Sequence, residues 1–340
     1  MKVAWLVARH PLFGGEYYRA ARPAALASKW FGWDTAACSY MGTTEEEDGG
    51  PLSLVTANDY VITPDIIVVR PIQEWRQHWT DQAHANGQKI VADLDDDLWK
   101  HEKYEQLQDE SPDHYNEWFW NVDAVMVSTR HMKNRMVEMG HKAPVFVAPN
   151  CYDPFGLNSS PRPGRVLGTR LWMSGRMEAD LALYDTMILP LLEELDLAFL
   201  HVGAGEPYGR FLDRGWPEER LIEKKTVPIP LMPEAMRELN IGTICMADHP
   251  FNDAKTETHA VELASMGVPL VAASNYSRYR SIPGRVPVDK DAVRSRVEDL
   301  LDPYTWLVES EKARHWARQI SFDSEQRYRK ALEKCVATLT

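Results

Sequence analysis

The sequence predicts an α/β protein of two tandem domains, each built around a parallel sheet. The chain has 340 residues, enough for two domains of roughly 150 residues each. Short apolar runs alternate with helix-length segments along most of the chain, as expected for parallel strands joined by crossover helices. A stretch rich in turn-forming residues, 149–164, interrupts this alternation near the middle. Two Rossmann-like units joined by a linker are the simplest interpretation.

The first predicted domain, 1–152, contains apolar runs that are short enough to be buried strands. These predicted strands are residues 3–7, 66–69, 89–92, 124–128 and 145–148. The predicted helices between them are residues 18–28, 74–86 and 130–139. Because strands and helices alternate, we expect crossover connections within one sheet.

The second predicted domain, 165–303, repeats this pattern after the linker. Its predicted strands are residues 171–174, 198–202, 241–246 and 269–273, and its predicted helices are 181–194, 233–239 and 256–266. Residues 304–340 form predicted C-terminal helices, with one apolar stripe of Trp306, Ala313, Trp316 and Ile320. Because such a stripe needs a surface to cover, we expect this segment to pack back on the first domain.

Composition and charge are those of a soluble globular protein. Apolar residues make up 44% of the chain and charged residues 26%, and the formal net charge of −12 disfavours polyanionic partners such as nucleic acids. No stretch approaches the ~20 apolar residues of a transmembrane segment, and the apolar run at the N-terminus is too brief for a signal peptide. The four cysteines are widely spaced, which argues against a zinc site or a disulfide framework. We expect a cytoplasmic protein.

Tryptophan is unusually frequent, with 12 residues in the chain. Seven of them form a cluster along the sequence between residues 30 and 120: Trp30, Trp33, Trp75, Trp79, Trp99, Trp118 and Trp120. Hydrophobic packing is the favoured interpretation. An aromatic platform for a sugar ring is the alternative.

The segment 246–269 carries most of the functional signal. It is predicted to run from the end of a strand through a loop into a helix, which is where anionic ligands bind in parallel sheets. Lys255 and Thr256 add a cation and a hydroxyl at the predicted start of this helix, so the segment suits a diphosphate. Glu262 follows two helical turns later on the same face and suits a ribose diol.

The same segment resembles the signature of retaining GT-B glycosyltransferases of the family 4-like group (glycosyl transferases group 1), which includes many bacterial and phage enzymes. Residues 262–271, Glu-Leu-Ala-Ser-Met-Gly-Val-Pro-Leu-Val, match its Glu-Ala-x-x-x-Gly-x-Pro-Val half, and residues 251–256 match a Phe-Asn-x-x-Lys-Ser variant. The resemblance implies two Rossmann-like domains facing a cleft. It also implies that Lys255 holds donor phosphate, with Asn252 and Thr256 beside it, and that Glu262 holds the nucleotide ribose.

Three further segments resemble the donor side of this family. Ser174, Gly175 and Arg176 resemble the strand and turn that open the second domain, where Arg176 can neutralise phosphate. Gly203 belongs to a glycine turn after a predicted strand, and Ile229 lies in the segment that faces the nucleotide base.

The acceptor side of the resemblance lies in the first domain. Gly14 and Gly15 resemble its glycine loop, and Arg19 on the following helix is a candidate to meet the diphosphate or an acidic acceptor. Asp93 and Asp95 belong to the run Asp-Leu-Asp-Asp-Asp after a predicted strand, a stretch that family 4-like relatives often carry without needing metal. A carboxylate there can orient an acceptor hydroxyl, although a solvated charge run is almost as good an interpretation.

Together these features predict transfer of a sugar from a nucleoside-diphosphate sugar to an acceptor hydroxyl with retention. Arg176, Lys255 and Asp95 are the predicted catalytic residues. The donor is a substrate, no cofactor is required, and neither Mg²⁺ nor Mn²⁺ is expected to be needed. The acceptor is not identified by the sequence; a glycan, a protein side chain and a modified nucleobase all stay open.

Two alternatives remain open at this point. The first is a metal-dependent transferase or phosphatase centred on Asp93 and Asp95, because Asp-x-Asp pairs bind divalent cations in other enzymes. The second is a catalytically inactive GT-B module that binds sugar nucleotides or proteins. Ala254 and Leu181, which replace an acidic residue and a lysine of the usual family pattern, are the basis of the second alternative.

Overall fold

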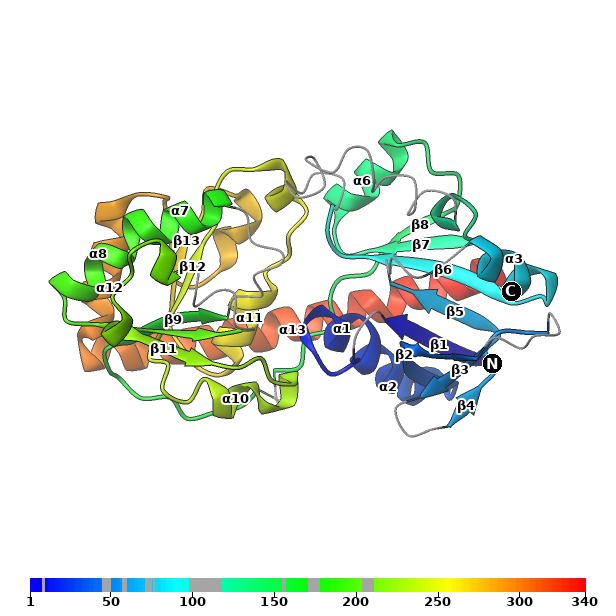
Figure 1. Ribbon diagram of the computed structural model, residues 1–340, viewed down its shortest axis with the longest axis horizontal. Coiled ribbons are helices and arrows are strands. Elements are labelled where there is room, and N and C mark those ends of the chain that lie inside the picture. Colours follow the sequence, from blue (N-terminus) through cyan, green and yellow to red (C-terminus); the bar gives the residue numbers. More distant parts are fainter. Residues whose placement is uncertain are drawn as a thin grey trace. The chain divides into compact units, whose positions relative to one another are not determined.

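The computed structural model describes residues 1–7, 10–44, 50–56, 60–70, 75, 77–97, 118–154, 157–170, 178–203 and 211–340. The chain forms two compact α/β units, each a sheet flanked by helices (Figure 1). The first unit comprises Met1–Cys151, Ala254–Thr256 and Asp323–Thr340, and the second comprises Tyr152–Asp253 and Glu257–Phe322. Within the described ranges, no helix combines the length and apolarity needed to cross a membrane.

The sheet of the first unit has the strand order β4-β3-β2-β1-β5-β6-β7-β8 in the described part of the chain. Its strands are β1 (Lys2–Val7), β2 (Asp34–Thr44), β3 (Ser53–Thr56), β4 (Val61–Ile62), β5 (Ile66–Val69), β6 (Lys89–Leu94), β7 (Ala124–Val127) and β8 (Val145–Val147). The pairings that involve β3 are antiparallel and the others are parallel. The carboxyl ends of β1, β5, β6, β7 and β8 therefore share one edge.

Helices cover both faces of this sheet. They are α1 (Gly14–Glu16), a π-helical turn (Tyr17–Ala21), α2 (Arg22–Phe31), α3 (Gln77–Ala85), α6 (Arg130–Glu138) and the end of α13 (Pro303–Leu339). Residues of α2 and α13 pack with Trp5 and Val68 on one face, whereas α3 and α6 pack with Leu6 and Val69 on the other. Alternate residues of β1 and β5 thus face opposite layers, as the two-residue period of a strand requires.

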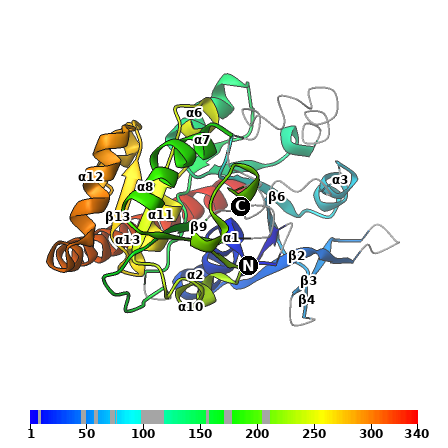
Figure 2. The ribbon, with the colours of Figure 1, turned by 60° about the vertical axis from the view of Figure 1, so that its left-hand side comes forward.

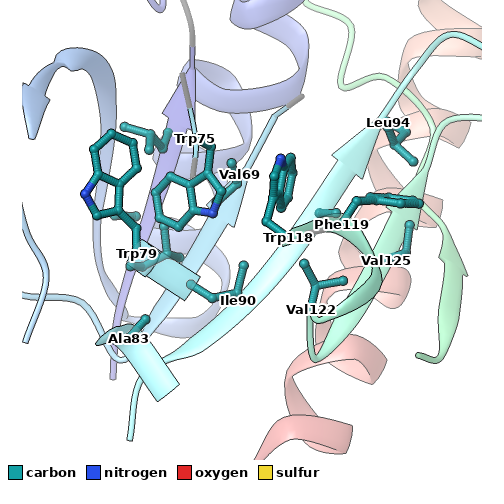
Figure 3. Packing of buried hydrophobic residues seen from close by; sticks show 14 of the residues in the cluster. Val69, Trp75, Trp79, Ala83, Ile90, Leu94, Trp118, Phe119, Val122 and Val125 are labelled. Atoms are coloured by element: carbon teal, nitrogen blue, oxygen red, sulfur yellow. The ribbon is translucent and has the colours of Figure 1, made fainter. Parts of the chain in front are cut away.

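Three tryptophans fill the core under α3 (Figure 3). Trp75, Trp79 and Trp118 are at most 5% exposed, and the ring centroid of Trp75 lies 5.5 Å from that of Trp79 and 6.3 Å from that of Trp118. Trp75 Nε1 donates to Thr80 Oγ1 at 2.9 Å, so its polar atom is satisfied inside the core. The packing interpretation is confirmed for these three residues, and Trp99 lies outside the described residues.

Asp123, in the turn before β7, anchors α3 and β6. Its carboxylate accepts from Ile90 N at 2.9 Å, His84 Nε2 at 2.9 Å and Lys89 Nζ at 3.1 Å. Burial disfavours the charged form, but these three donors outweigh burial and lower the pKa of Asp123. The ionised carboxylate therefore stabilises the folded state.

Replacing Asp123 with alanine is expected to lower the free energy of unfolding by about 1.5–3 kcal/mol at pH 7. Because the folded pKa lies below the unfolded value of about 3.9, this contribution is complete above that value and disappears as pH falls through the folded pKa. Urea unfolding at several pH values checks the prediction. A difference between wild type and variant that stays constant from pH 7 to about pH 3 would contradict it.

The second unit contains a parallel sheet with the order β11-β10-β9-β12-β13-β14 in its described part. Its strands are β9 (Val166–Arg170), β10 (Ala198–Val202), β11 (Leu221–Lys224), β12 (Ile241–Cys245), β13 (Leu270–Ala273) and β14 (Arg285–Val286). Its helices are α7 (Glu178–Met187), α8 (Leu189–Glu194), α10 (Met232–Ala235), α11 (Thr258–Ser265), α12 (Lys290–Leu301) and the start of α13. Residues of α7, α8 and α12 share one core with the sheet, and the three helices lie on the same side of it in Figure 2.

The predicted apolar stripe of the C-terminal segment is largely buried. Trp306, Ala313 and Trp316 are at most 8% exposed, and Trp306 Nε1 donates to Asn240 O at 2.7 Å in the second unit. The helix continues to Leu339, and its last part belongs to the first unit, where Tyr328 and Leu332 are buried.

The observed elements differ from the predicted ones in three ways. The strands β2, β3, β4, β11 and β14 were not predicted, and helix α12 was not predicted either. The predicted helix 181–194 is two helices, because the chain leaves the helix at Ile188 and starts again with Pro190 in its first turn. The strand that opens the second sheet is Val166–Arg170, and the predicted strand 171–174 lies outside the described residues.

Candidate functional site

Charged residues gather at the carboxyl edge of the first sheet. β1 is followed by Gly14, Gly15 and the helical turn that carries Arg19, and β5 is followed directly by Arg70. The acidic run that begins at Asp93 in β6 continues past the end of that strand. Because parallel strands bring their carboxyl ends to one edge, these loops meet where α/β sheets generally bind ligands.

Each carboxylate of the acidic run contacts a different cation of the first unit. The pairs are Asp93 with Arg19, Asp95 with Arg70 at 2.8 Å, Asp96 with Lys255 at 3.0 Å and Asp97 with Arg135 at 3.5 Å. The four cations come from four separate segments of the chain. The run is therefore not a solvated charge cluster but the point where these segments are joined.

The pair of Arg19 and Asp93 lies wholly in the interior, with 0% exposure of both side chains. Arg19 Nε donates to Asp93 Oδ2 at 3.0 Å, and its guanidinium also donates to the carbonyl of Ala148. Burial disfavours the charge of Arg19, but the charge and hydrogen bonds of Asp93 outweigh it and raise the pKa of Arg19. In this structure the two predicted acceptor-side residues, Arg19 and Asp93, contact each other and are buried in the protein interior.

Arg70 holds Asp95, and the sequence analysis did not single it out. Its guanidinium contacts Asp95 Oδ1 at 2.8 Å, Glu16 Oε2 at 3.0 Å and the carbonyl of Gly15 at 3.3 Å. Gly15 permits this close approach, because a Cβ at that position would lie 3.1 Å from Asp95 Oδ2. The position of Arg70 immediately after a predicted buried strand was the signal available in the sequence.

The electrostatic surroundings of Asp95 favour its ionised form. Burial alone would raise its pKa, but the charges of Arg70, Arg19 and Lys255 outweigh burial and lower it. The side chain of Asp95 is 21% exposed, so it keeps access to solvent. Asp95 is thus a fixed, partly exposed carboxylate at the edge of the sheet.

Lys255 and Thr256 reach the same edge. The segment Ala254–Thr256 belongs to the first unit, with Ala254 buried in its core. Lys255 Nζ donates to Asp96 Oδ2 at 3.0 Å, and Asn150 Nδ2 donates to Thr256 Oγ1 at 3.1 Å. The predicted phosphate-binding residues and the predicted acceptor-side carboxylates are therefore brought together.

In the second unit, the loop after β12 is held by two residues that the sequence analysis missed. Asp180 Oδ1 accepts from Ala247 N at 2.7 Å and from Asn252 Nδ2 at 2.9 Å. The hydroxyl of Tyr276 accepts from His249 N at 2.7 Å and lies within hydrogen-bond distance of the carbonyls of Ala247 and His249. Asn252, a predicted donor-binding residue, is 1% exposed, and in this structure it anchors the loop.

Helix α11 follows this loop and is almost entirely buried. Glu262 is 1% exposed, and its neighbours on both sides are buried as well. The helix ends at Ser265, and Gly267 follows its C-cap residue Met266; Gly267 has a φ of +77°, and a Cβ there would lie 2.3 Å from the guanidinium of Arg314. The glycine of the motif is thus required by the helix end and by close packing.

The remaining predicted donor residues lie in the second unit or outside the described part. Gly203 N donates to Lys224 O at 3.0 Å and extends the pairing of β10 with β11. Ile229 is 1% exposed at the start of a 3₁₀ turn, Ile229–Leu231. Ser174, Gly175 and Arg176 lie outside the described residues.

The described residues contain no group of three or more His, Cys, Asp or Glu side chains that could hold a metal ion. Asp93 and Asp95, the centre of the metal-dependent alternative, each contact an arginine instead.

Comparison with known proteins identifies the fold. No family model matches the chain, and no curated protein matches it. Among solved structures, sucrose-phosphate synthase from Thermosynechococcus elongatus is similar with a TM-score of 0.60 and 12% identity, over 98% of this chain and 99% of that one. TarM gives 0.55 and 11%, and the pneumococcal O-GlcNAc transferase GtfA, in complex with UDP and GlcNAc, gives 0.55 and 14%.

These matches cover 88% of the chain for TarM and 86% for GtfA, but only 63% and 67% of those two proteins. The chain thus spans less than two thirds of the length of TarM. At such low identity the similarity shows the fold, which is the GT-B arrangement of two Rossmann-like units. The predicted fold class is confirmed as two Rossmann-like α/β units.

Proposed function

We propose that this protein is a glycosyltransferase that moves a sugar from a nucleoside-diphosphate sugar to an acceptor hydroxyl. The observation that carries the proposal is the meeting of Lys255 and Thr256 with Asp96 and Asn150 at the carboxyl edge of the first sheet. A cation and a hydroxyl suited to phosphate lie there beside carboxylates suited to a hydroxyl group. The GT-B fold, shared with proteins named as a synthase and an O-GlcNAc transferase, supports the same function.

On the donor side we assign the departing diphosphate to Lys255 and Thr256, which precede Glu257, the N-cap residue of α11, in the chain. Backbone N–H groups at the start of a helix favour anionic groups. Asn252 contributes by holding the preceding loop, and Arg176 with Ser174 and Gly175 contributes a second cation through the family motif. Because Glu262 is buried, we rank Lys255 above Glu262 as a donor ligand.

The reaction that we propose proceeds with retention and without a protein nucleophile. The donor C–O bond breaks as the acceptor oxygen attacks the same face, and the departing phosphate takes the acceptor proton. Lys255 neutralises the charge that develops on that phosphate. Asp95, fixed by Arg70, helps orient the acceptor, which is a glycan, a protein side chain or a modified nucleobase.

We further propose that the reaction needs no divalent metal. Each carboxylate from Asp93 to Asp97 already contacts a lysine or arginine, so the negative charge that would attract Mg²⁺ or Mn²⁺ is neutralised by the protein. Lys255 supplies at the diphosphate the positive charge that a metal would otherwise provide.

A thermal-shift screen against uridine, guanosine, adenosine and cytidine diphosphate sugars tests the proposal, with each compound measured in Mg²⁺ and in EDTA. A ligand that binds the folded state raises the apparent Tm, and saturation at 100 times Kd corresponds to about 2.7 kcal/mol. We expect one nucleotide class to raise the Tm equally in both buffers. A shift that requires Mg²⁺ would favour the metal-dependent alternative at Asp93 and Asp95.

Transfer activity separates the enzyme from an inactive binding module. A ligand that raises the Tm should also be cleaved to its nucleoside diphosphate, which mass spectrometry detects. Binding without any cleavage or transfer would favour the binding module, for which Ala254 and Leu181 were the sequence signals.

A further inference from the structure

The four ion pairs of the acidic run differ in their exposure. Arg19 and Asp93 are both 0% exposed, and Asp97 is 2% exposed beside Arg135. Arg70 is 11% exposed beside Asp95. Asp95 itself is 21% exposed, whereas Lys255 and Asp96 are 25% and 29% exposed, so their pair is the most exposed of the four and leaves both partners within reach of a ligand.

The pair is also the only one of the four that uses lysine. Arg19 and Arg70 hold several acceptors at once through a planar fork, which fixes their position. An ammonium group has three donors on a flexible stem, and it can exchange one partner for another by rotation. The diphosphate of a sugar nucleotide offers more negative charge than one carboxylate, so it is the stronger partner for Lys255.

Asp96 depends on Lys255 for its charge balance. Within the part of the chain that the structure describes, Lys255 is its hydrogen-bonded cation, and Asp95 is its acidic neighbour in sequence. Burial raises the pKa of Asp96, and the charge of Asp95 adds to this effect while Lys255 opposes it. When Lys255 moves away, a hydrogen bond from another donor stabilises the ionised form of the Asp96 carboxylate.

We propose that Asp96 competes with the donor diphosphate for Lys255, and that donor binding releases the Asp96 carboxylate to accept a hydrogen bond from the acceptor hydroxyl. The inference rests on the proposed function and adds to it the order in which the two substrates bind. In the free protein, Lys255 occupies the Asp96 carboxylate, so that the acceptor hydroxyl cannot bind to it. When the donor diphosphate binds Lys255, the Asp96 carboxylate becomes accessible to the acceptor. The donor therefore binds first, and the acceptor binds second.

The release of Asp96 from Lys255 adds no covalent step to the reaction. Asp96 accepts a hydrogen bond from the acceptor hydroxyl and orients its oxygen, while the proton itself leaves with the departing phosphate. Asp95 remains paired with Arg70 throughout. Asp96 is then a second carboxylate, beside Asp95, that contacts the acceptor.

Asp96→Asn tests this competition, because asparagine keeps the shape of the side chain but removes the charge that holds Lys255. Isothermal titration with UDP, or with the nucleoside diphosphate that gives the largest thermal shift, is expected to show about 3- to 10-fold tighter binding by the variant. Release of the nucleoside diphosphate from the corresponding sugar nucleotide, with water as the acceptor of the sugar, is expected to fall at least 10-fold. Asp81→Asn, an exposed carboxylate of α3, is the matched control and should change neither quantity.

A double-mutant cycle distinguishes competition for Lys255 from an effect of Asp96→Asn on folding. If Asp96 acts through Lys255, the tighter binding caused by Asp96→Asn must vanish when Lys255→Ala is also present. UDP affinity that is unchanged or weaker in Asp96→Asn would overturn the inference while leaving the proposed function intact. If the wild type binds no nucleoside diphosphate, the proposed function fails, and this inference fails with it.

Discussion

Lys255→Ala is expected to lower kcat/KM for sugar transfer by about 10²–10³-fold, the loss typical of removing one group that stabilises developing negative charge. Its ammonium lies 3.0 Å from Asp96 and is 25% exposed, so it can reach a bound diphosphate. The stability cost should be small, at most about 1 kcal/mol, because partly exposed ion pairs contribute little. Steady-state kinetics with the donor found in the thermal-shift screen measure the effect.

Lys334→Ala is the matched control, because Lys334 is an exposed lysine of α13. It should leave both turnover and Tm unchanged. If Lys255→Ala retains more than about a tenth of wild-type kcat/KM, Lys255 does not act on the transition state, since the loss of one charge contact there should cost at least about tenfold, or about 1.4 kcal/mol.

Arg19→Met is expected to cause the largest loss of stability among the substitutions considered, about 3–5 kcal/mol. The substitution leaves Asp93 buried at 0% exposure without its cation, while methionine fills most of the space of the arginine stem. Urea unfolding monitored by tryptophan fluorescence measures the free energy, because Trp5 lies in the same core. Activity should fall only as far as the folded fraction falls.

Arg22→Met is the matched control for this prediction. Arg22 contacts Glu325 at 3.1 Å, but both side chains are partly exposed, so its loss should cost about 1 kcal/mol or less. The double variant Arg19→Met with Asp93→Leu should recover part of the lost stability, because no unpaired charge remains. An Arg19→Met variant as stable as Arg22→Met would contradict the prediction, because the buried pair of Arg19 and Asp93 would then contribute no more to stability than a partly exposed pair.

The buried parallel strands were predictable because they are continuous apolar runs. β5 and β10 match the predicted ranges, and β1, β6 and β7 differ only at their ends. β2 was missed because its sequence mixes polar residues and glycine with apolar ones, and β14 because only two residues pair with β13. Such strands are defined by their neighbours in the sheet rather than by a local pattern.

The candidate site was predictable only in part. Lys255 and Thr256, which lie at the edge of the first sheet, were predicted from one continuous segment. Glu262, predicted from the same segment, is buried in α11. The contact of Lys255 with Asp96 joins residues 159 positions apart, and that of Asp93 with Arg19 joins residues 74 positions apart, so neither leaves a local signal. Asp180 and Tyr276 were missed for the same reason, since they act on the backbone of a distant loop.

The most direct measurement of the central proposal is the release of nucleoside diphosphate from a sugar nucleotide by the purified protein in EDTA, with water as the acceptor of the sugar, followed by mass spectrometry. The proposed function predicts release by the wild type at the same rate in EDTA and in Mg²⁺, and loss of release in Lys255→Ala. Absence of release from every donor in both buffers, under conditions where the protein is folded, would contradict the assignment as a glycosyltransferase.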